Sequence, residues 1–94
     1  MNEAIIIDPL DNVATTTTNL EAGSTVTFKF GSKKRVKLKQ SIPFGHKFAL
    51  ENIKKGEKVI KYGEMIGRAT QSIDEGDHVH IHNVESMRGR GDLE

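Results

Sequence analysis

The chain of 94 residues contains no cysteine. It therefore has no disulfide framework, no thiolate metal ligand and no cysteine nucleophile, which fits a reducing cytosol. Its N-terminus lacks both a basic region and a long apolar stretch, so we expect no signal peptide, and no later segment is apolar enough to span a membrane. These absences predict a cytoplasmic protein that makes no membrane contact.

Larger architectures are also missing from the sequence. Neither a parallel βαβ pattern nor a dinucleotide-binding glycine motif is present. A length of 94 residues supports one small domain, whose modest core is often stabilised further by a partner or by homo-oligomerisation. We expect this domain over residues 1–84. Residues 85–94 hold two glycines, alternating charge and little to bury, so we expect them to form a flexible tail.

Six basic residues lie within positions 29–39, although the net charge of the whole chain is only +1. Such a run raises the question of nucleic-acid binding. In positions 35–39, however, Val36 and Leu38 alternate with the charges, and no aromatic residue lies among the charges of 33–39 as a stacking platform. We therefore expect a solvated edge strand and no nucleic-acid partner, with an anion-binding or partner surface as the alternative.

One short pattern occurs four times in the chain, at residues 20–26, 42–48, 53–59 and 73–79. Each copy reads apolar residue, two residues, glycine, two residues, apolar residue. Glycine adopts positive φ without steric cost, so the pattern predicts a turn at each glycine. The apolar residues on both sides of each turn are then expected to pack on a core.

The rest of the sequence is mainly typical of β-structure. Alternating or β-branched residues predict strands at 4–7, 25–30, 35–38, 47–50, 58–61, 65–70 and 78–82. Gly31 and Ser32 are expected to form the turn of a hairpin. Asp11 can cap a short helix that ends near Leu20, and a polar strand is the alternative because threonines occupy 15–18. The predicted fold is mainly antiparallel β with at most one short helix.

Histidines occupy every second position of the last predicted strand, at His78, His80 and His82. Alternate residues of a strand share a face, so the three imidazoles would form one row while the residues between them face the core. Imidazoles in this arrangement can converge on a metal ion, and His46 can contribute from another segment. Two alternatives are a polar strand face that binds nothing specific and a row that contacts an anionic substrate or transfers protons.

Three stretches, 42–50, 53–70 and 73–83, together resemble the N-terminal SAF-type domain of the altronate and galactarate dehydratase family. The most specific parts are 45–47, 61–63 with Ile66 and Gly67, and 78–83. The resemblance extends over residues 8–83. It implies a β-clip fold, placed beside a much larger domain or subunit that carries most of the lyase machinery.

The resemblance also implies an activity. The chain would be the small subunit of a sugar-acid hydro-lyase that removes water from an aldonic or aldaric acid, together with a large catalytic subunit and a divalent metal, iron or manganese. The isolated chain is expected to be inactive. The alternatives are the small subunit of a sulfolactate sulfo-lyase and a non-catalytic SAF binding module.

The site residues follow by position from the same resemblance. Catalytic roles are implied for His46, His80 and His82. Contacts with the anionic substrate are implied for Lys47, Lys61, Arg68 and Asn83, although solvated strand charge is the alternative for Lys61 and Arg68. Metal ligation is expected from His78, His80 and His82.

Overall fold

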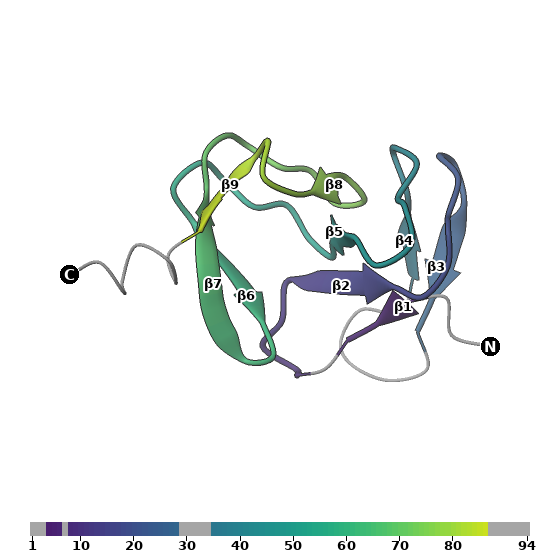
Figure 1. Ribbon diagram of the computed structural model, residues 1–94, viewed down its shortest axis with the longest axis horizontal. Helices are drawn as coiled ribbons and strands as arrows, with labels where there is room; N and C mark the ends of the chain where they lie inside the picture. The colour runs from purple at the N-terminus through teal and green to yellow at the C-terminus, as the bar shows by residue number, and fades with distance from the viewer. Residues whose placement is uncertain (1–3, 7, 29–34, 87–94) are drawn as a thin grey trace.

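The computed structural model describes residues 4–6, 8–28 and 35–86, and these contain nine short strands and no helix (Figure 1). It follows that no described helix is long and apolar enough to cross a membrane. The strands are β1 (Ala4–Ile5), β2 (Val13–Thr16), β3 (Thr25–Thr27), β4 (Arg35–Lys37), β5 (Lys47–Ala49), β6 (Lys58–Lys61), β7 (Glu64–Ala69), β8 (His78–Val79) and β9 (Val84–Ser86).

These strands form three sheets, and every strand pair is antiparallel. The orders are β1-β2-β5-β8, β3-β4 and β6-β7-β9. Figure 1 shows β3 and β4 at one end of the molecule, β6, β7 and β9 at the other, and β2 and β5 between them. The predicted small, mainly antiparallel β domain is therefore confirmed. The expected hairpin turn at Gly31 and Ser32 lies outside the described residues.

The four glycine turns predicted from the repeated pattern are also present. The backbone φ angle is +89° at Gly23, +83° at Gly45, +90° at Gly56 and +89° at Gly76. In each copy the residue after the glycine donates its backbone N–H to the carbonyl three residues earlier. This is the arrangement of a type II turn, whose third position requires positive φ.

The apolar residues of the pattern are all buried, and they divide between two cores. The first two copies supply Leu20, Val26, Ile42 and Phe48 to one cluster. The last two copies supply Ile53, Val59, Ile73 and Val79 to the other. Each pair of copies is joined by a backbone bridge, Leu20 to Ile42 and Ile53 to Ile73. The structure thus divides the four copies between two halves, each with its own core.

Strands β2 and β5 connect the two cores because successive side chains point to opposite faces of their sheet. Ala14 and Phe48 face the first cluster, whereas Val13 and Ala49 face the second. Val13 pairs with Ala49, and Ala14 pairs with Phe48. The four-stranded sheet therefore lies between the two cores and contributes side chains to both.

The short helix predicted from Asp11 to Leu20 is wrong, because strand β2 occupies this segment, as in the polar-strand alternative. The Asp11 carboxylate accepts the backbone N–H of Gly63 at 2.8 Å and that of Asp8 at 3.1 Å, so it joins the β6–β7 turn to β2. Thr16 is buried, and its hydroxyl donates to the Pro43 carbonyl at 2.8 Å. β-branched residues suit such a strand.

The chain beyond position 84 begins as a strand. Glu85 and Ser86, the first two residues of the expected tail, belong to β9 and pair with Arg68 and Gly67 of β7. Gly67 allows this close approach, since a Cβ there would lie 2.6 Å from the Glu85 carbonyl oxygen. Residues 87–94 lie outside the described residues.

The described part of the basic run is a solvated strand, as predicted. Val36 and Leu38 are buried, while Arg35 and Lys37 are exposed. Lys39 pairs with Asp74 at 2.8 Å on the surface, and this carboxylate raises the pKa of the Lys39 amine. The remainder of the run, 29–34, lies outside the described residues.

Candidate metal centre

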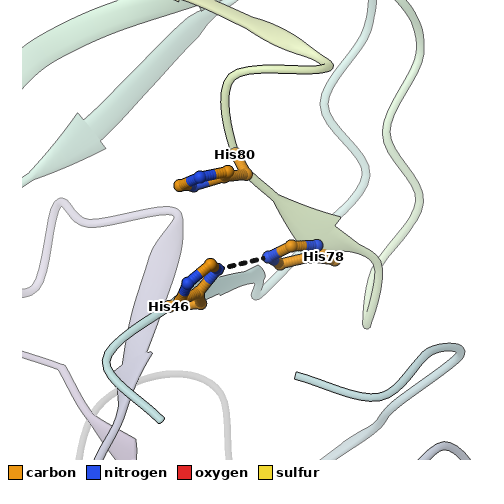
Figure 2. Close-up of side chains that lie close together, drawn as sticks. All are labelled: His46, His78 and His80. Atoms are coloured by element: carbon orange, nitrogen blue, oxygen red, sulfur yellow. Dashed lines mark hydrogen bonds between the residues drawn. The ribbon is translucent and has the colours of Figure 1, made fainter. Parts of the chain in front are cut away.

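Two neighbouring strands bring three histidines together. His46 follows the Gly45 turn and directly precedes β5, and His78 begins β8. Strands β5 and β8 are antiparallel, and Phe48 lies opposite His78. Because His46 lies two residues before Phe48, it faces His80, which lies two residues after His78 and just beyond the end of β8. Figure 2 shows the three imidazoles gathered at this point. One nitrogen of each of these three rings lies within 4.8 Å of the others.

The rings already interact with one another. Nδ1 of His46 and Nε2 of His78 are 2.9 Å apart, which is a hydrogen bond between complementary tautomers. The His46 ring stacks on those of His78 and His80, with centroid distances of 5.0 and 4.5 Å. A metal ion that binds imidazoles at about 2.1 Å holds its nitrogen ligands about 3 to 3.5 Å apart. The three donors therefore fit a divalent transition metal after small movements.

The histidine row expected from an extended strand is not formed, because β8 ends at Val79 and the chain turns through 80–83. Ile81 was expected to face the core, but its side chain is 84% exposed. The His82 ring contacts the His78 ring at a centroid distance of 5.3 Å, yet it lies outside the three-donor cluster. His46, expected as a catalytic residue and as a ligand from another segment, completes the cluster in its place.

Asn83 holds this turn through hydrogen bonds. Its side chain is buried, its Oδ1 accepts the His80 backbone N–H at 2.9 Å, and its Nδ2 donates to the His78 carbonyl at 2.8 Å. Its own backbone N–H donates to the His80 carbonyl at 3.1 Å. The resemblance implies that Asn83 contacts the substrate. In the structure, its side-chain amide instead makes its hydrogen bonds within the chain.

The surroundings of His78 and His80 favour the uncharged form of these two imidazoles. Burial lowers the pKa of His78, and the neighbouring charges of His46, His82, His80 and Lys47 lower it further. Burial also lowers the pKa of His80, followed by the effects of His46 and Lys47. A neutral imidazole has a lone pair available for a metal, so these shifts favour metal ligation at neutral pH.

Lys47 lies beside the cluster as a partly buried cation. Burial lowers the pKa of its amine, and repulsion from Lys61 lowers it further. Lys47 forms no ion pair with any residue of the described chain. A partly buried ammonium without a carboxylate partner is suited to bind an anion, which is the role that the resemblance implies for Lys47.

A cavity of about 250 Å³ adjoins the cluster. It is lined by the apolar side chains of Ile66, Val79, Ile81 and Val84, and also by Lys47 and His80. Lys47 and His80 are thus shared between the cavity and the surroundings of the histidines. An apolar side chain and an adjacent anion could occupy this region together.

The structure separates the two remaining predicted substrate contacts. Lys61 lies near enough to Lys47 to influence its pKa, and its Nζ is 4.7 Å from the centre of the Tyr62 ring. Arg68 is exposed on β7 and lines a different cavity of about 410 Å³ with Asn12 and Glu57. Lys61 therefore lies near Lys47, whereas Arg68 does not line the cavity beside the histidines.

Fold and site together define a small all-β domain that presents convergent imidazoles beside a partly buried lysine. The sequence model of the altronate/galactarate dehydratase SAF domain matches residues 2–87. The chain therefore belongs to this SAF domain family, as its sequence predicts.

The chain is similar to a subunit of one enzyme and to a segment of another. It is 51% identical over 51 residues to the (2R)-sulfolactate sulfo-lyase subunit alpha of Chromohalobacter salexigens, which covers 54% of each chain. It is 45% identical over 82 residues to the altronate dehydratase of Escherichia coli, covering 87% of this chain and 16% of that enzyme. The sulfo-lyase subunit alpha of Paracoccus pantotrophus is 46% identical over 54 residues, which are 57% of this chain and 81% of that subunit. The chain thus spans about half of the first relative and about a sixth of the altronate dehydratase.

Proposed function

We propose that this chain is the small SAF-domain subunit of a sugar-acid dehydratase of the altronate/galactarate type. It assists the removal of water from an aldonic or aldaric acid together with a large catalytic subunit. The convergence of His46, His78 and His80 beside Lys47, in a domain of this family, is the observation that carries the proposal.

The three imidazoles are the residues that would hold a divalent metal. Nitrogen ligands suit iron better than manganese, which prefers oxygen ligands, so we expect iron unless the partner adds carboxylates. When bound, the metal would supply positive charge that favours transfer of the proton next to the substrate carboxylate to a base of the large subunit. Lys47, with Lys61 nearby, binds the carboxylate of the acid.

His82 is the proposed proton carrier. It is the fourth histidine of the group, it is exposed, and it lies outside the three-donor cluster while its ring contacts that of His78. It is therefore free of metal ligation and can donate a proton to the leaving hydroxyl group, which departs as water. Direct catalytic roles for His46 and His80 would compete with ligation, so we assign them to the metal.

The proposed partner meets this domain beside the histidines. Ile81 is 84% exposed in the turn that carries His80 and His82, and it lines the apolar cavity. The exposed Ile81 side chain and the apolar residues of this cavity together form an apolar patch, which is typical of a contact surface. In the E. coli altronate dehydratase the matching segment is only 16% of the enzyme, so a much longer remainder accompanies this domain there.

The small subunit of a sulfolactate sulfo-lyase is the second candidate. It is favoured by the 51% identity to a relative that is itself named as a separate subunit alpha. Both reactions need a proton removed next to a carboxylate and a leaving group lost from the neighbouring carbon. The chemistry of the histidines and Lys47 therefore serves either reaction, and the partner decides which group leaves.

Affinity capture of the tagged chain from its native extract tests the proposal. The recovered complex is assayed for 2-keto-3-deoxy acid formed from aldonic and aldaric acids, and for sulfite released from sulfolactate. We expect a large lyase subunit and dehydratase activity, both lost with Ile81→Asp. The matched control is Leu10→Asp, because Leu10 is also exposed, at 69%, but does not line this cavity. Sulfite release would select the second candidate, and capture of no lyase subunit would support a free-standing binding module.

A further inference from the structure

Asn83 forms hydrogen bonds with the backbone of His80, a metal-ligand candidate that lies outside the strands. His80 follows the end of β8, so no strand pairing fixes it. Both of its backbone polar groups bond to Asn83 instead, its N–H to Oδ1 at 2.9 Å and its carbonyl to the Asn83 N–H at 3.1 Å. The Asn83 amide also donates to the His78 carbonyl at 2.8 Å.

The turn of residues 80–83 is itself hydrogen-bonded to the segment that follows β7. The Asn83 carbonyl accepts the backbone N–H of Thr70 at 2.9 Å, and the His82 carbonyl accepts the Gln71 side chain at 3.2 Å. Asn83 is 5% exposed, so water competes little for its amide. Two ligand candidates, His78 and His80, are therefore held at a set separation through one buried side chain.

We propose that Asn83 is a positioning residue that arranges His78 and His80 for metal binding before any metal arrives. The inference rests on the proposed metal role of the histidines. Without the amide, the segment after β8 must be ordered when the metal binds, and the cost of that ordering is subtracted from the binding free energy. Partners of this kind commonly change metal affinity by about 10-fold to 100-fold.

The chain contains a matched control for this residue. Asn12 is also buried, its Oδ1 accepts the Ile60 N–H at 2.7 Å, and its Nδ2 donates to the Lys58 carbonyl at 2.8 Å. It thus bridges one backbone N–H and one backbone carbonyl, as Asn83 does. Asn12 bonds to β6 rather than to the histidines, and it lines the cavity that contains Arg68. Truncation of either amide removes an equivalent pair of side-chain hydrogen bonds, but only one of them touches the ligand segment.

The experiment is a titration of the whole chain with Co²⁺, followed by the visible absorption of the bound ion, which reports its ligand number. We expect one saturable site in the wild type. Asn83→Ala should weaken Co²⁺ binding about 10-fold to 100-fold and change the spectrum toward fewer nitrogen ligands. Asn12→Ala should lower the melting temperature to a similar extent but leave the Co²⁺ affinity and spectrum unchanged.

A second measurement, on the metal-free wild type, covers the case in which Asn83→Ala fails to fold. The His80 amide proton should exchange as slowly as that of Ile60, which Asn12 holds. Rapid exchange at His80, or equal Co²⁺ affinity of wild type and Asn83→Ala, would overturn the inference and leave the metal site intact. Absence of Co²⁺ binding by the wild type would refute the metal role of the histidines, and the positioning role with it.

Discussion

A methyl group added at Gly76 tests whether this glycine is needed for its backbone conformation alone or also for close packing against β4. Gly23, Gly56 and Gly76 have nearly identical φ angles of +89°, +90° and +89°. A Cβ at Gly23 or Gly56 meets nothing within 4 Å, whereas a Cβ at Gly76 overlaps the backbone carbonyl of Lys37. The three alanine variants therefore share the same backbone strain, and only Gly76→Ala adds a steric clash.

The expected magnitudes follow from this difference. An alanine in the left-handed region costs about 1 to 2 kcal/mol, and the reduced freedom of the unfolded chain returns about 0.4 to 1 kcal/mol. Gly23→Ala and Gly56→Ala should each lower the free energy of unfolding by about 1 kcal/mol, or about 4 to 8 °C in melting temperature for a domain of this size. The clash at Gly76 adds about 1 to 3 kcal/mol, because the backbone of β4 must move.

The assay is urea unfolding of the three variants beside the wild type, with thermal unfolding as a check. Gly76→Ala should be the least stable, with a midpoint well below those of the other two variants. Gly76 also accepts the Lys39 N–H at 3.0 Å and donates to the Ala49 carbonyl at 2.9 Å, so its displacement disturbs both halves. Equal stability of Gly76→Ala and Gly56→Ala would refute the close packing between this turn and β4.

Two further predictions concern the histidines and the β6–β7 turn. His46→Ala should abolish saturable Co²⁺ binding by the chain. His82→Ala should preserve Co²⁺ binding, but it should remove the lyase activity of the complex with the large subunit. Loss of Co²⁺ binding in both variants would contradict the three-donor cluster. Tyr62 has a φ of +58° and precedes Gly63 at +74°, so Tyr62→Asn should raise the melting temperature. Asn-Gly suits a two-residue hairpin turn, and we expect a gain of about 0.5 to 1 kcal/mol in the free energy of unfolding. A lower melting temperature for Tyr62→Asn would show that the ring contributes more than the backbone strain costs.

The turns and the burial of the apolar residues beside them could be predicted from the sequence because their causes are local. A glycine between apolar residues determines both the backbone angle and the burial of its neighbours, and strand β6 has the predicted bounds 58–61. Side chains that act over long distances along the chain could not be read in this way. Asp11 resembles a helix cap, but its carboxylate accepts a hydrogen bond from the backbone N–H of Gly63, which lies 52 positions away.

The histidine site was predicted in part for the same reason. The pattern of His78, His80 and His82 is visible, but the end of β8 depends on the reach of the Asn83 amide back to residue 78. No periodicity reports such a contact. The inclusion of His46 depends on the register of β5 against β8, which joins residues 32 positions apart. The family resemblance indicates the residues of this region, and the structure adds which of them meet.

The placement of the histidines within the repeat shows how the site arises on this fold. All four copies of the pattern build the same turn, but only the second and fourth carry histidine within two residues after the glycine, at His46 and His78. The strands that follow these two copies, β5 and β8, are neighbours in the four-stranded sheet. The strands that follow the other two copies, β3 and β6, lie in separate sheets. Histidines after the first and third glycines would not meet through strand pairing, so the topology permits a shared centre where the sequence provides the imidazoles.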